Sequence, residues 1–498
     1  MTQQSHGMSN YESFLKETMT AEAIIDRPQN FGRLGFPNPI TGAGFNPQKV
    51  IDSFGAALDE MRDTSDPQSD VEAGMTFFGQ FIDHDITLDA TSAIGSAIDP
   101  ATIRNVRTPA LELDSVYGAG PEASPFMYSK NHPGYLYYGR AGNAHDLPRN
   151  HEGTAVIGDH RNDENSLISQ LHSAFIAFHN IALDHAHGDA AMVAHALEGV
   201  RSKITDDAMK PEEKPFEAAR RIVRHHYQWL VLNDFLPAFV DPKVLKSVNE
   251  AFLGGEPPKL FQGAAALISV EFAVSAFRFG HATVQNKYRI NDTVGEIGLF
   301  DPGFRGFKPR DEQFNIDFAN VFDFTGSSGH QCARPISRKL AASIYDLPFV
   351  GEGISFDGAV IPLEMARKLP HRNVFRDRFA LHVNSGQQMA RLLKVKELGA
   401  PKELTSRGIS KTPLWYYCLH EAEQHGGKLG PVGGTLVAGT LVRLLVEDPE
   451  SVVHQHGWRP MQQFGATASG QFSLGRLLQF VQANRDGVSV KDELRTPH

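Results

Sequence analysis

Apolar residues recur at spacings of three and four along much of the chain, which is the pattern of amphipathic helices. Alternating strand patterns are scarce, and stretches rich in asparagine, glycine and proline separate the helical segments. We therefore predict a mainly α fold with little β structure, built as one large domain with long irregular loops. The predicted helical segments are 71–87, 165–188, 214–240, 264–286, 335–346, 386–397 and 432–447, and the predicted loops are 118–150, 291–330 and 348–360.

The first 45 residues are rich in glycine, proline and asparagine and predict an irregular arm, so residues 46–498 form the predicted folded domain. The chain starts with a polar segment and shows no basic stretch followed by an apolar one, so we expect no secretory signal. That expectation favours a cytoplasmic protein or one exported by a leaderless route. No apolar run approaches the roughly 18 residues that span a bilayer, so we expect no membrane span.

The composition of the 498 residues is that of a soluble globular protein, with 41% hydrophobic and 21% charged residues. A net charge of −10 repels phosphate backbones, so a nucleic-acid partner is not expected. Two cysteines, Cys332 and Cys418, exclude a disulfide framework and a cysteine-rich zinc site. The 22 histidines direct attention to metal ligation and proton transfer. The oligomeric state is left open.

One segment, FFGQFIDHDIT, concentrates candidate chemistry on a predicted helix. Gln80 and His84 are four residues apart and share a helix face. Asp83, His84 and Asp85 point about 100° from one another, so they face different surroundings. An imidazole both accepts and donates a proton near neutrality, which suits His84 to acid–base catalysis. The alternative interpretation is an exposed acidic patch with a hydrogen-bonded histidine.

The segment GQFIDHDIT resembles the distal-histidine motif of the animal-type haem peroxidases, the superfamily that includes myeloperoxidase, peroxinectin and the cyclooxygenases. The resemblance covers roughly residues 70–450. It continues in order through TPALELDSVYG, GDHRNDENSLISQLHSAFIAFHN, VEFAVSAFRFGH, LPHRNVFRDR and PLWYYCLHEAE. It implies haem b as cofactor, and hydrogen peroxide with a small electron donor as substrates.

On the distal side of the haem, the resemblance assigns proton transfer to His84 and a fixed positive charge to Arg161. Arginine does not deprotonate, so its charge stabilises an oxygen that leaves as an anion. Gln80 is implied to hydrogen-bond peroxide or the water that precedes it. The alternative for Arg161 is a salt bridge in an acidic surface loop.

On the proximal side, the resemblance implies His281 as the iron ligand and Asn373 as the acceptor of its other ring N–H. Arg278 and Arg376 match family positions near the haem propionates. The alternatives are an ordinary core histidine and solvated basic residues.

Asp83 and Glu164 occupy positions at which mammalian family members form esters with the haem. The sequence supplies both acids and leaves open whether the bonds form. Asn165 stands where some members have a methionine that makes a sulfonium link, so that link is excluded. This departure argues against the most strongly oxidising, chloride-using behaviour.

The loop TPALELD offers oxygen ligands at alternate residues and resembles the calcium site of the family. Calcium takes six to eight oxygen ligands. The candidate ligands are Asp85, Thr108, Ala110 (through its carbonyl), Glu112 and Asp114. An acidic loop that binds nothing is the alternative.

The leading functional hypothesis is a haem peroxidase that acts on small organic donors or on a halide or pseudohalide. Two alternatives stay open: a haem fatty-acid dioxygenase of the same superfamily, and a noncatalytic haem-binding or adhesion protein. Cyclooxygenase-like members carry a radical-forming tyrosine three residues before the proximal histidine. This chain has Arg278 there, which favours the peroxidase.

Overall fold

The computed structural model describes residues 30–38, 46–88, 105, 107–198, 210–264, 266–327, 329–356 and 359–497. Most of the predicted N-terminal arm lies outside these residues. No helix in the described ranges is both long enough and apolar enough to cross a membrane.

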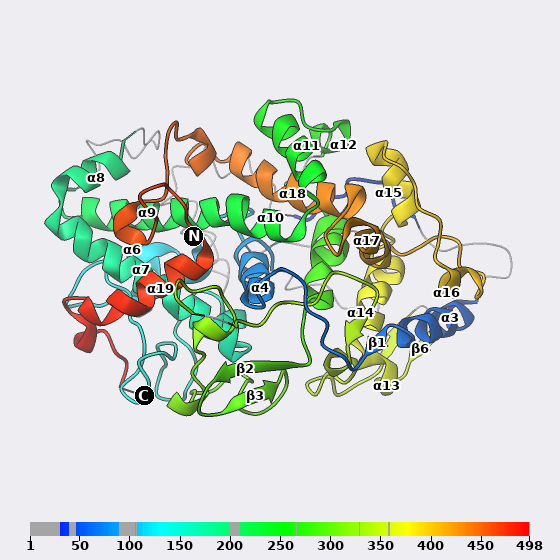
Figure 1. The fold of residues 1–498 in the computed structure, drawn as a ribbon, viewed down its shortest axis with the longest axis horizontal. Helices are drawn as coiled ribbons and strands as arrows, with labels where there is room; N and C mark the ends of the chain where they lie inside the picture. Colours follow the sequence, from blue (N-terminus) through cyan, green and yellow to red (C-terminus); the bar gives the residue numbers. More distant parts are fainter. Residues whose placement is uncertain are drawn as a thin grey trace, which may run out of the picture.

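Helices dominate the fold, as predicted (Figure 1). The longer ones are α3 (Pro47–Asp59), α4 (Gly74–Ile86), α7 (Ser166–Gly188), α9 (Lys214–Leu230), α11 (Pro242–Leu253), α15 (Gly386–Leu393), α17 (Leu414–Ala422), α18 (Pro431–Glu447) and α19 (Leu474–Asn484). The shorter ones are α5 (Asp114–Tyr117), α6 (Gly120–Ala123), α8 (Ala190–Ala196), α10 (Leu236–Phe239), α12 (Lys259–Gln262), α13 (Leu363–Ala366), α14 (Leu369–Phe375) and α16 (Lys402–Thr405).

The strands of the described chain form three two-stranded sheets, in agreement with the predicted scarcity of β structure. Strands β2 (Lys287–Asn291) and β3 (Gly295–Gly298) form an antiparallel hairpin, as do β5 (Ile354–Phe356) and β6 (Ala359–Ile361). The short strands β1 (Arg62–Asp63) and β4 (Leu340–Ala341) pair in parallel, so they join two distant parts of the chain.

Most predicted helices are confirmed within a few residues, namely those at 71–87, 165–188, 386–397 and 432–447. The segment 214–240 is α9, a π-helical turn at Val231–Phe235 and α10 in succession. Two predictions need correction. Residues 335–346 hold β4 and a 3₁₀ turn, because Leu340 pairs with Arg62. Residues 264–286 become helical only at Glu271, through a π turn and the 3₁₀ segment η6 (Ala276–Ala282).

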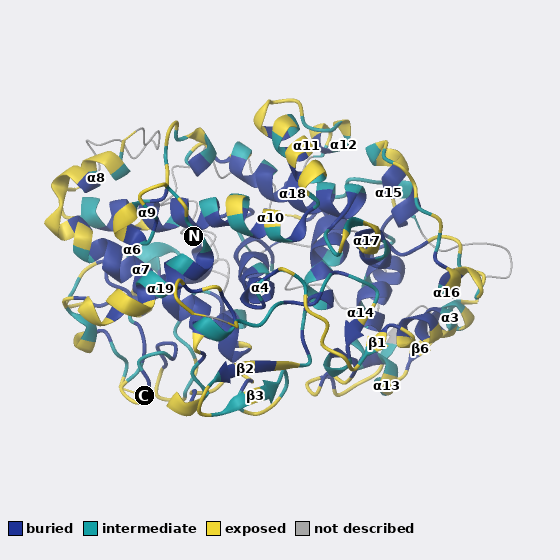
Figure 2. Ribbon diagram, in the orientation of Figure 1, coloured by how far each residue is buried: buried dark blue, intermediate teal, exposed yellow. Residues whose placement is uncertain are grey.

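The core is built around α4 and α7, which are buried on nearly all sides (Figure 2). A helix that is apolar around its whole circumference belongs inside a large domain. Phe81 of α4 stacks on Phe175 of α7 with ring centroids 5.0 Å apart, and Tyr227 of α9 meets Phe81 edge-on at 6.1 Å. Polar side chains on α4 are therefore surrounded by fixed neighbours, which is what a catalytic site requires.

Candidate active site

The central helix α4 carries the distal candidates, and its geometry separates them as expected. His84 is only 5% exposed, and Asp85 is fully buried. Asp83 lies beside the proximal segment, with an oxygen 3.8 Å from Nη1 of Arg278. Asp85 faces the opposite way and accepts a hydrogen bond from the backbone N–H of Leu113 at 3.2 Å. The helix thus presents its two acids to different surroundings, with His84 between them.

His84 is held through one ring nitrogen. Its Nδ1 lies 2.8 Å from Oδ1 of Asn162, so Nδ1 donates to this carbonyl oxygen and Nε2 stays an acceptor. Burial, assisted by the charge of Arg161, lowers the pKa of His84 to about 4. The imidazole is therefore neutral at neutral pH and can take up a proton at Nε2.

Arg161 is fixed against the carboxyl-terminal end of α4. Its Nη2 donates to the carbonyl oxygens of His84 (3.0 Å) and Thr87 (2.7 Å), and Nε and Nη2 bind the carboxylate of Asp159. Burial alone would raise the pKa of Asp159, but the charges and hydrogen bonds of Arg161 and Arg107 hold it below its ordinary value. Among the described residues, Nη1 of Arg161 has no hydrogen-bond partner and is available to a ligand.

Gln80, one turn before His84, is oriented by the loop that carries Arg161. Its Nε2 donates to Glu164 at 2.7 Å, and its Oε1 accepts from Nδ2 of Asn165 at 3.2 Å. Glu164 is exposed to solvent at the surface, but the surrounding protein desolvates its carboxyl group and raises its pKa. The loop and α4 therefore bring Gln80 and the predicted ester-forming acid Glu164 into direct contact.

His281 lies in η6 and has the environment of a neutral metal ligand. Its Nδ1 is 2.9 Å from Nδ2 of Asn373 on α14, so the two side chains meet, but the amide presents its nitrogen where the resemblance implied an acceptor oxygen. Rotating this amide by 180° would exchange Nδ2 for Oδ1, and the oxygen could then accept the N–H of a ring that binds iron through Nε2. Burial and then the charge of Arg278 lower the pKa of His281 to about 3. A Cβ at Gly280 would meet no heavy atom within 4 Å, so space adjoins this segment.

Arg278 connects the two sides of the candidate site. Its Nε donates to the carbonyl oxygen of Ala273 at 3.0 Å, while its Nη1 approaches Asp83 of α4. Arg376 follows α14 directly, and its charge also lowers the pKa of His281. Both arginines therefore lie near the ligand candidate, which agrees with a role beside an anionic group.

The predicted calcium ligands come together only in part. Asp85 and Asp114 each keep one buried carboxylate oxygen without a partner in the described chain. Burial and then the charge of Asp114 raise the pKa of Asp85 well above its ordinary value, while burial raises that of Asp114 to about 7. Glu112 adds a third negative charge. Asp85 accepts a hydrogen bond from Leu113 and Asp114 pairs with Arg107 through their other oxygens, so a cation would satisfy the one remaining oxygen of each acid.

The other two calcium candidates contribute no carboxylate. The carbonyl oxygen of Thr108 accepts a hydrogen bond from the N–H of Ala110 at 2.8 Å. Within the described ranges, no three aspartate, glutamate, histidine or cysteine side chains converge as a metal cluster would require. A cation at this loop would therefore depend on backbone and hydroxyl oxygens as well as on the acids.

Sequence reasoning missed the residues behind His84. The periodicity of α7 suggests only a packing role for His172, but its Nδ1 lies 2.9 Å from Nδ2 of Asn162. Asn162 is thus shared by two histidines. Its position directly after Arg161, within the motif GDHRNDEN, was the available signal. Only the packing of α4 on α7 shows that His172 is the second partner of Asn162.

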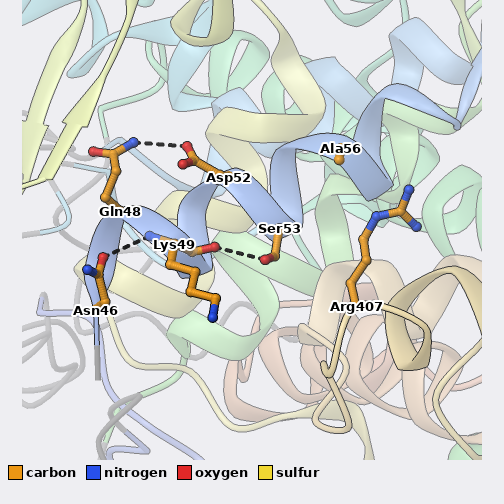
Figure 3. A pocket seen from close by; sticks show the side chains of 7 residues that line it. All are labelled: Asn46, Gln48, Lys49, Asp52, Ser53, Ala56 and Arg407. Atoms are coloured by element: carbon orange, nitrogen blue, oxygen red, sulfur yellow. Dashed lines mark hydrogen bonds between the residues drawn. The ribbon is translucent and has the colours of Figure 1, made fainter. Parts of the chain in front are cut away.

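A surface pocket of about 530 Å³ lies apart from these residues, on one face of α3 (Figure 3). Its polar groups are largely engaged with one another: Gln48 donates to Asp52 at 2.9 Å, and Asn46 accepts from the backbone of Lys49 at 2.9 Å. Arg407, on its far side, pairs with Glu60. None of the predicted site residues lines this pocket.

The structure describes a mainly α domain with two buried histidines, each held by an asparagine, and comparison with known proteins identifies the family. The sequence model of the animal haem peroxidases matches residues 90–448. The chain therefore belongs to the animal haem peroxidase family. The matched region contains Arg161, His281 and Asn373, while His84 precedes it.

Curated relatives are similar over parts of their length. Chorion peroxidase of Drosophila melanogaster is 24% identical over 290 residues, which cover 54% of this chain and 32% of that protein. Thyroid peroxidase of Homo sapiens is 26% identical over 129 residues, which cover 26% of this chain and 12% of that protein. This chain thus spans less than a third of the length of these relatives.

Solved structures share the fold at low identity. Peroxidase A from Dictyostelium discoideum superposes with a TM-score of 0.56 at 15% identity, covering 84% of this chain and 88% of that one. A fatty acid alpha-dioxygenase from Arabidopsis thaliana superposes with a TM-score of 0.60 at 14% identity, covering 95% of this chain and 78% of that one. At these identities the likeness concerns the fold alone, which both activities use.

Proposed function

We propose that this protein is a haem peroxidase that reduces hydrogen peroxide and oxidises small soluble donors such as phenols, or bromide or thiocyanate. One observation carries the proposal. His84 and His281 each engage an asparagine through Nδ1, and the approach of Asp83 to Arg278 brings their two segments together. Oδ1 of Asn162 keeps the proton of His84 on Nδ1 and leaves its Nε2 for a ligand, and Asn373 holds the ring of His281 at the corresponding atom.

The residues present fit a haem held by His281. Asn373 lies against Nδ1 of the ring, and with its amide rotated by 180° its Oδ1 would accept the ring N–H and fix the ring, while Arg278 and Arg376 would supply positive charge for the propionates. A bound haem would supply the redox chemistry by which peroxide is reduced and the donor oxidised. The amide partner leaves the imidazole less basic than a carboxylate would, which affects the iron's potential.

His84 and Arg161 move the proton and stabilise the charge. His84 takes the proton of hydrogen peroxide at Nε2 and returns it to the oxygen that leaves as water. The guanidinium of Arg161 stabilises negative charge on that oxygen, and it needs no reorganisation because Asp159 and two backbone carbonyls already fix it. Gln80 hydrogen-bonds peroxide from the turn before His84.

The dioxygenase alternative is less well supported by the residues. Arg278 occupies the position where a cyclooxygenase-like radical would need a tyrosine, and a guanidinium carries no phenoxyl radical. The hydroxyl of Tyr416 donates to Glu403 and that of Tyr417 accepts from the backbone N–H of Leu398, so both phenol groups are engaged by other partners. The noncatalytic alternative leaves the acid–base residue and the fixed charge without a purpose.

The test is a pair of assays on the haem-loaded protein. We expect rapid reaction with hydrogen peroxide in stopped flow and steady oxidation of guaiacol. Linoleate or arachidonate, incubated under oxygen with a trace of peroxide, should give no stoichiometric oxygen uptake. A regiospecific lipid hydroperoxide with little guaiacol turnover would establish the dioxygenase instead. Absence of both activities would support the noncatalytic alternative.

We also propose a calcium ion between Asp85 of α4 and the TPALELD loop at residues 108–114. Metal analysis of purified protein should give about one calcium per chain. Asp85→Asn or Asp114→Asn should lose it, whereas Asp292→Asn, an exposed acid paired with Arg289, should retain it. Active wild-type protein without calcium would exclude the site.

Covalent attachment through Asp83 and Glu164 completes the proposal. Acidified organic solvent extracts free haem from denatured protein and leaves ester-linked haem on the polypeptide. We expect retention in the wild type after turnover with peroxide, and full extraction from the double variant Asp83→Asn, Glu164→Gln. Full extraction from the wild type would refute the esters.

A further inference from the structure

The side chain behind the catalytic histidine is a shared amide with two opposite faces. Asn162, fully buried, presents Oδ1 to Nδ1 of His84 at 2.8 Å and Nδ2 to Nδ1 of His172 at 2.9 Å. His172 is also fully buried, on α7, and packs edge-on against Phe81 of α4 with ring centroids 6.0 Å apart. The two histidines are therefore linked through one side chain, with no solvent to rescue a lost bond.

A neutral imidazole has two tautomers, and only one serves as a base at Nε2. A carbonyl oxygen accepts and never donates, so Oδ1 of Asn162 requires the proton of His84 to be on Nδ1. The lone pair is then on Nε2, the atom that must receive the proton of peroxide. With the amide turned around, Nδ2 would donate to Nδ1, the proton would sit on Nε2, and His84 could not act as a base there.

The amide orientation is coupled to the tautomer of His172. In the productive orientation, Nδ2 donates to Nδ1 of His172, which must be an acceptor. The same orientation also suits His84 after proton uptake, because an imidazolium donates from both nitrogens and Oδ1 still receives Nδ1–H. No group has to rotate while the proton arrives and leaves.

We propose that Asn162 and His172 are positioning residues that hold His84 in the tautomer with its proton on Nδ1. This inference rests on the proposed peroxidase function. Asn162 acts by direct hydrogen bonding to His84, and His172 acts through Asn162. Neither touches a substrate.

Three variants separate this role from simple structural support. Asn162→Leu removes both hydrogen bonds at similar volume. Asn162→Asp keeps an acceptor oxygen facing His84. Its second oxygen replaces Nδ2, and the ring of His172 can donate Nδ1–H to that oxygen. His172→Phe removes only the acceptor that orients the amide. Outer partners of this kind typically contribute about 10- to 100-fold.

The matched controls, Asn180 and His179, lie on α7, the helix that carries His172. Asn180 is fully buried and makes two hydrogen bonds to the backbone of Leu136, and His179 is fully buried and bonds Gly134. Asn180→Leu and His179→Phe therefore impose comparable losses of buried hydrogen bonds without contact to Asn162.

The first measurement is the stopped-flow rate constant for the reaction of haem-loaded protein with hydrogen peroxide. Asn162→Leu should slow this reaction about 10- to 100-fold, and Asn162→Asp should restore most of the loss. His172→Phe should give a smaller decrease, and both controls should match the wild type. Haem content and guaiacol KM should change little, because the haem ligand and donor site are untouched.

The second measurement reports the tautomer without turnover. In the ferrous carbon monoxide form, which is diamagnetic, ring-¹⁵N histidine labelling distinguishes a protonated from an unprotonated nitrogen, and His84→Ala assigns the signal. The wild type and Asn162→Asp should show Nδ1–H. Asn162→Leu and His172→Phe should show a larger share of Nε2–H.

The outcomes distinguish the two proposals. A wild-type protein that does not react with peroxide would refute the peroxidase function. The ¹⁵N signals of His84 would still show which of its ring nitrogens carries the proton. A reactive wild type whose rate and tautomer are unchanged in Asn162→Leu and His172→Phe would overturn the positioning role. Should Asn162→Leu fail to fold, Asn162→Asp and His172→Phe still give opposite expectations.

Discussion

The two sides of the candidate site support their histidines in different ways. On the distal side, His84 is surrounded by charged and amide groups: Arg161 with Asp159, and Asn162 with His172. On the proximal side, His281 has one amide partner, Asn373, and follows the buried Phe277 and Phe279 in the chain. A group that must gain and lose a proton needs oriented dipoles, whereas a metal ligand needs to stay neutral and fixed.

The segments that carry the two groups of residues are also fixed by different interactions, by ion pairs on the distal side and by neutral hydrogen-bond donors on the proximal side. The distal loop is fixed by buried ion pairs, in which Arg149 binds both Asp163 and Asp146 through pairs of hydrogen bonds of 2.7–3.0 Å. The proximal turns are fixed by Asp377, which receives hydrogen bonds from Ser275 and from the backbone of Trp415 at 3.0 Å. The comparison predicts that damage to the distal side affects reactivity, and damage to the proximal side affects cofactor retention.

The largest expected effect is loss of the cofactor in His281→Ala. Removing the imidazole removes the predicted iron ligand, so the purified variant should lose its haem or show a different ligand set in its optical spectrum. His84→Ala is the matched control and should keep its haem. Equal haem content and an unchanged spectrum in His281→Ala would contradict the division of roles.

The next effect concerns the distal groups alone. His84→Ala should slow the reaction with peroxide by roughly 10²- to 10⁴-fold while haem stays bound, because general acid–base catalysis contributes that much. Arg161→Lys keeps the charge but loses the clamp on two backbone carbonyls, so it should fall between wild type and Arg161→Ala. Stopped flow gives these rate constants, and wild-type values would refute the distal assignment.

A smaller effect should follow from opening the distal scaffold. Arg149→Ala leaves the buried carboxylate of Asp163 without its ion pair, while Asp146 keeps Arg140, and should reduce the free energy of unfolding by about 3–5 kcal/mol. Arg289→Ala breaks an exposed pair with Asp292 and should cost less than about 1 kcal/mol. Urea titration monitored by fluorescence measures both. Equal costs would show that the distal loop does not depend on these ion pairs.

The smallest effect tests Glu72, which lies just before α4. Burial raises the pKa of its carboxyl from 4.5 to about 7. The folded state therefore binds more protons than the unfolded state between these values, and stability falls as the pH rises through this window. Glu72→Gln should be more stable than wild type at pH 8 by about 1–2 kcal/mol, with little difference at pH 4.

Thermal unfolding at the two pH values measures this difference. Glu296→Gln, at an exposed position of β3, is the control and should follow the wild type at both. If the stability of Glu72→Gln changed with pH as that of the wild type does, the pKa of Glu72 would not differ between the folded and the unfolded states.

Local patterns predicted much of the helical structure because helix periodicity is a property of neighbouring residues. The spacing of apolar residues located α4, α7 and α18 within a few positions. The same rule failed at residues 335–346, where pairing of Leu340 with Arg62 forms a strand. It also missed α14 and α19, because a short helix in a large domain is stabilised mainly by what it packs on.

By itself, the sequence determined which chemistry the chain carries: the order of its motifs, the four-residue spacing of Gln80 and His84, and the absence of a tyrosine at position 278. The tertiary structure decided which groups meet. The approach of Asp83 to Arg278 and the sharing of Asn162 by His84 and His172 join residues from separate elements. A hydrogen bond needs distance and direction, and these are set only when α4, α7 and the loop between them pack together.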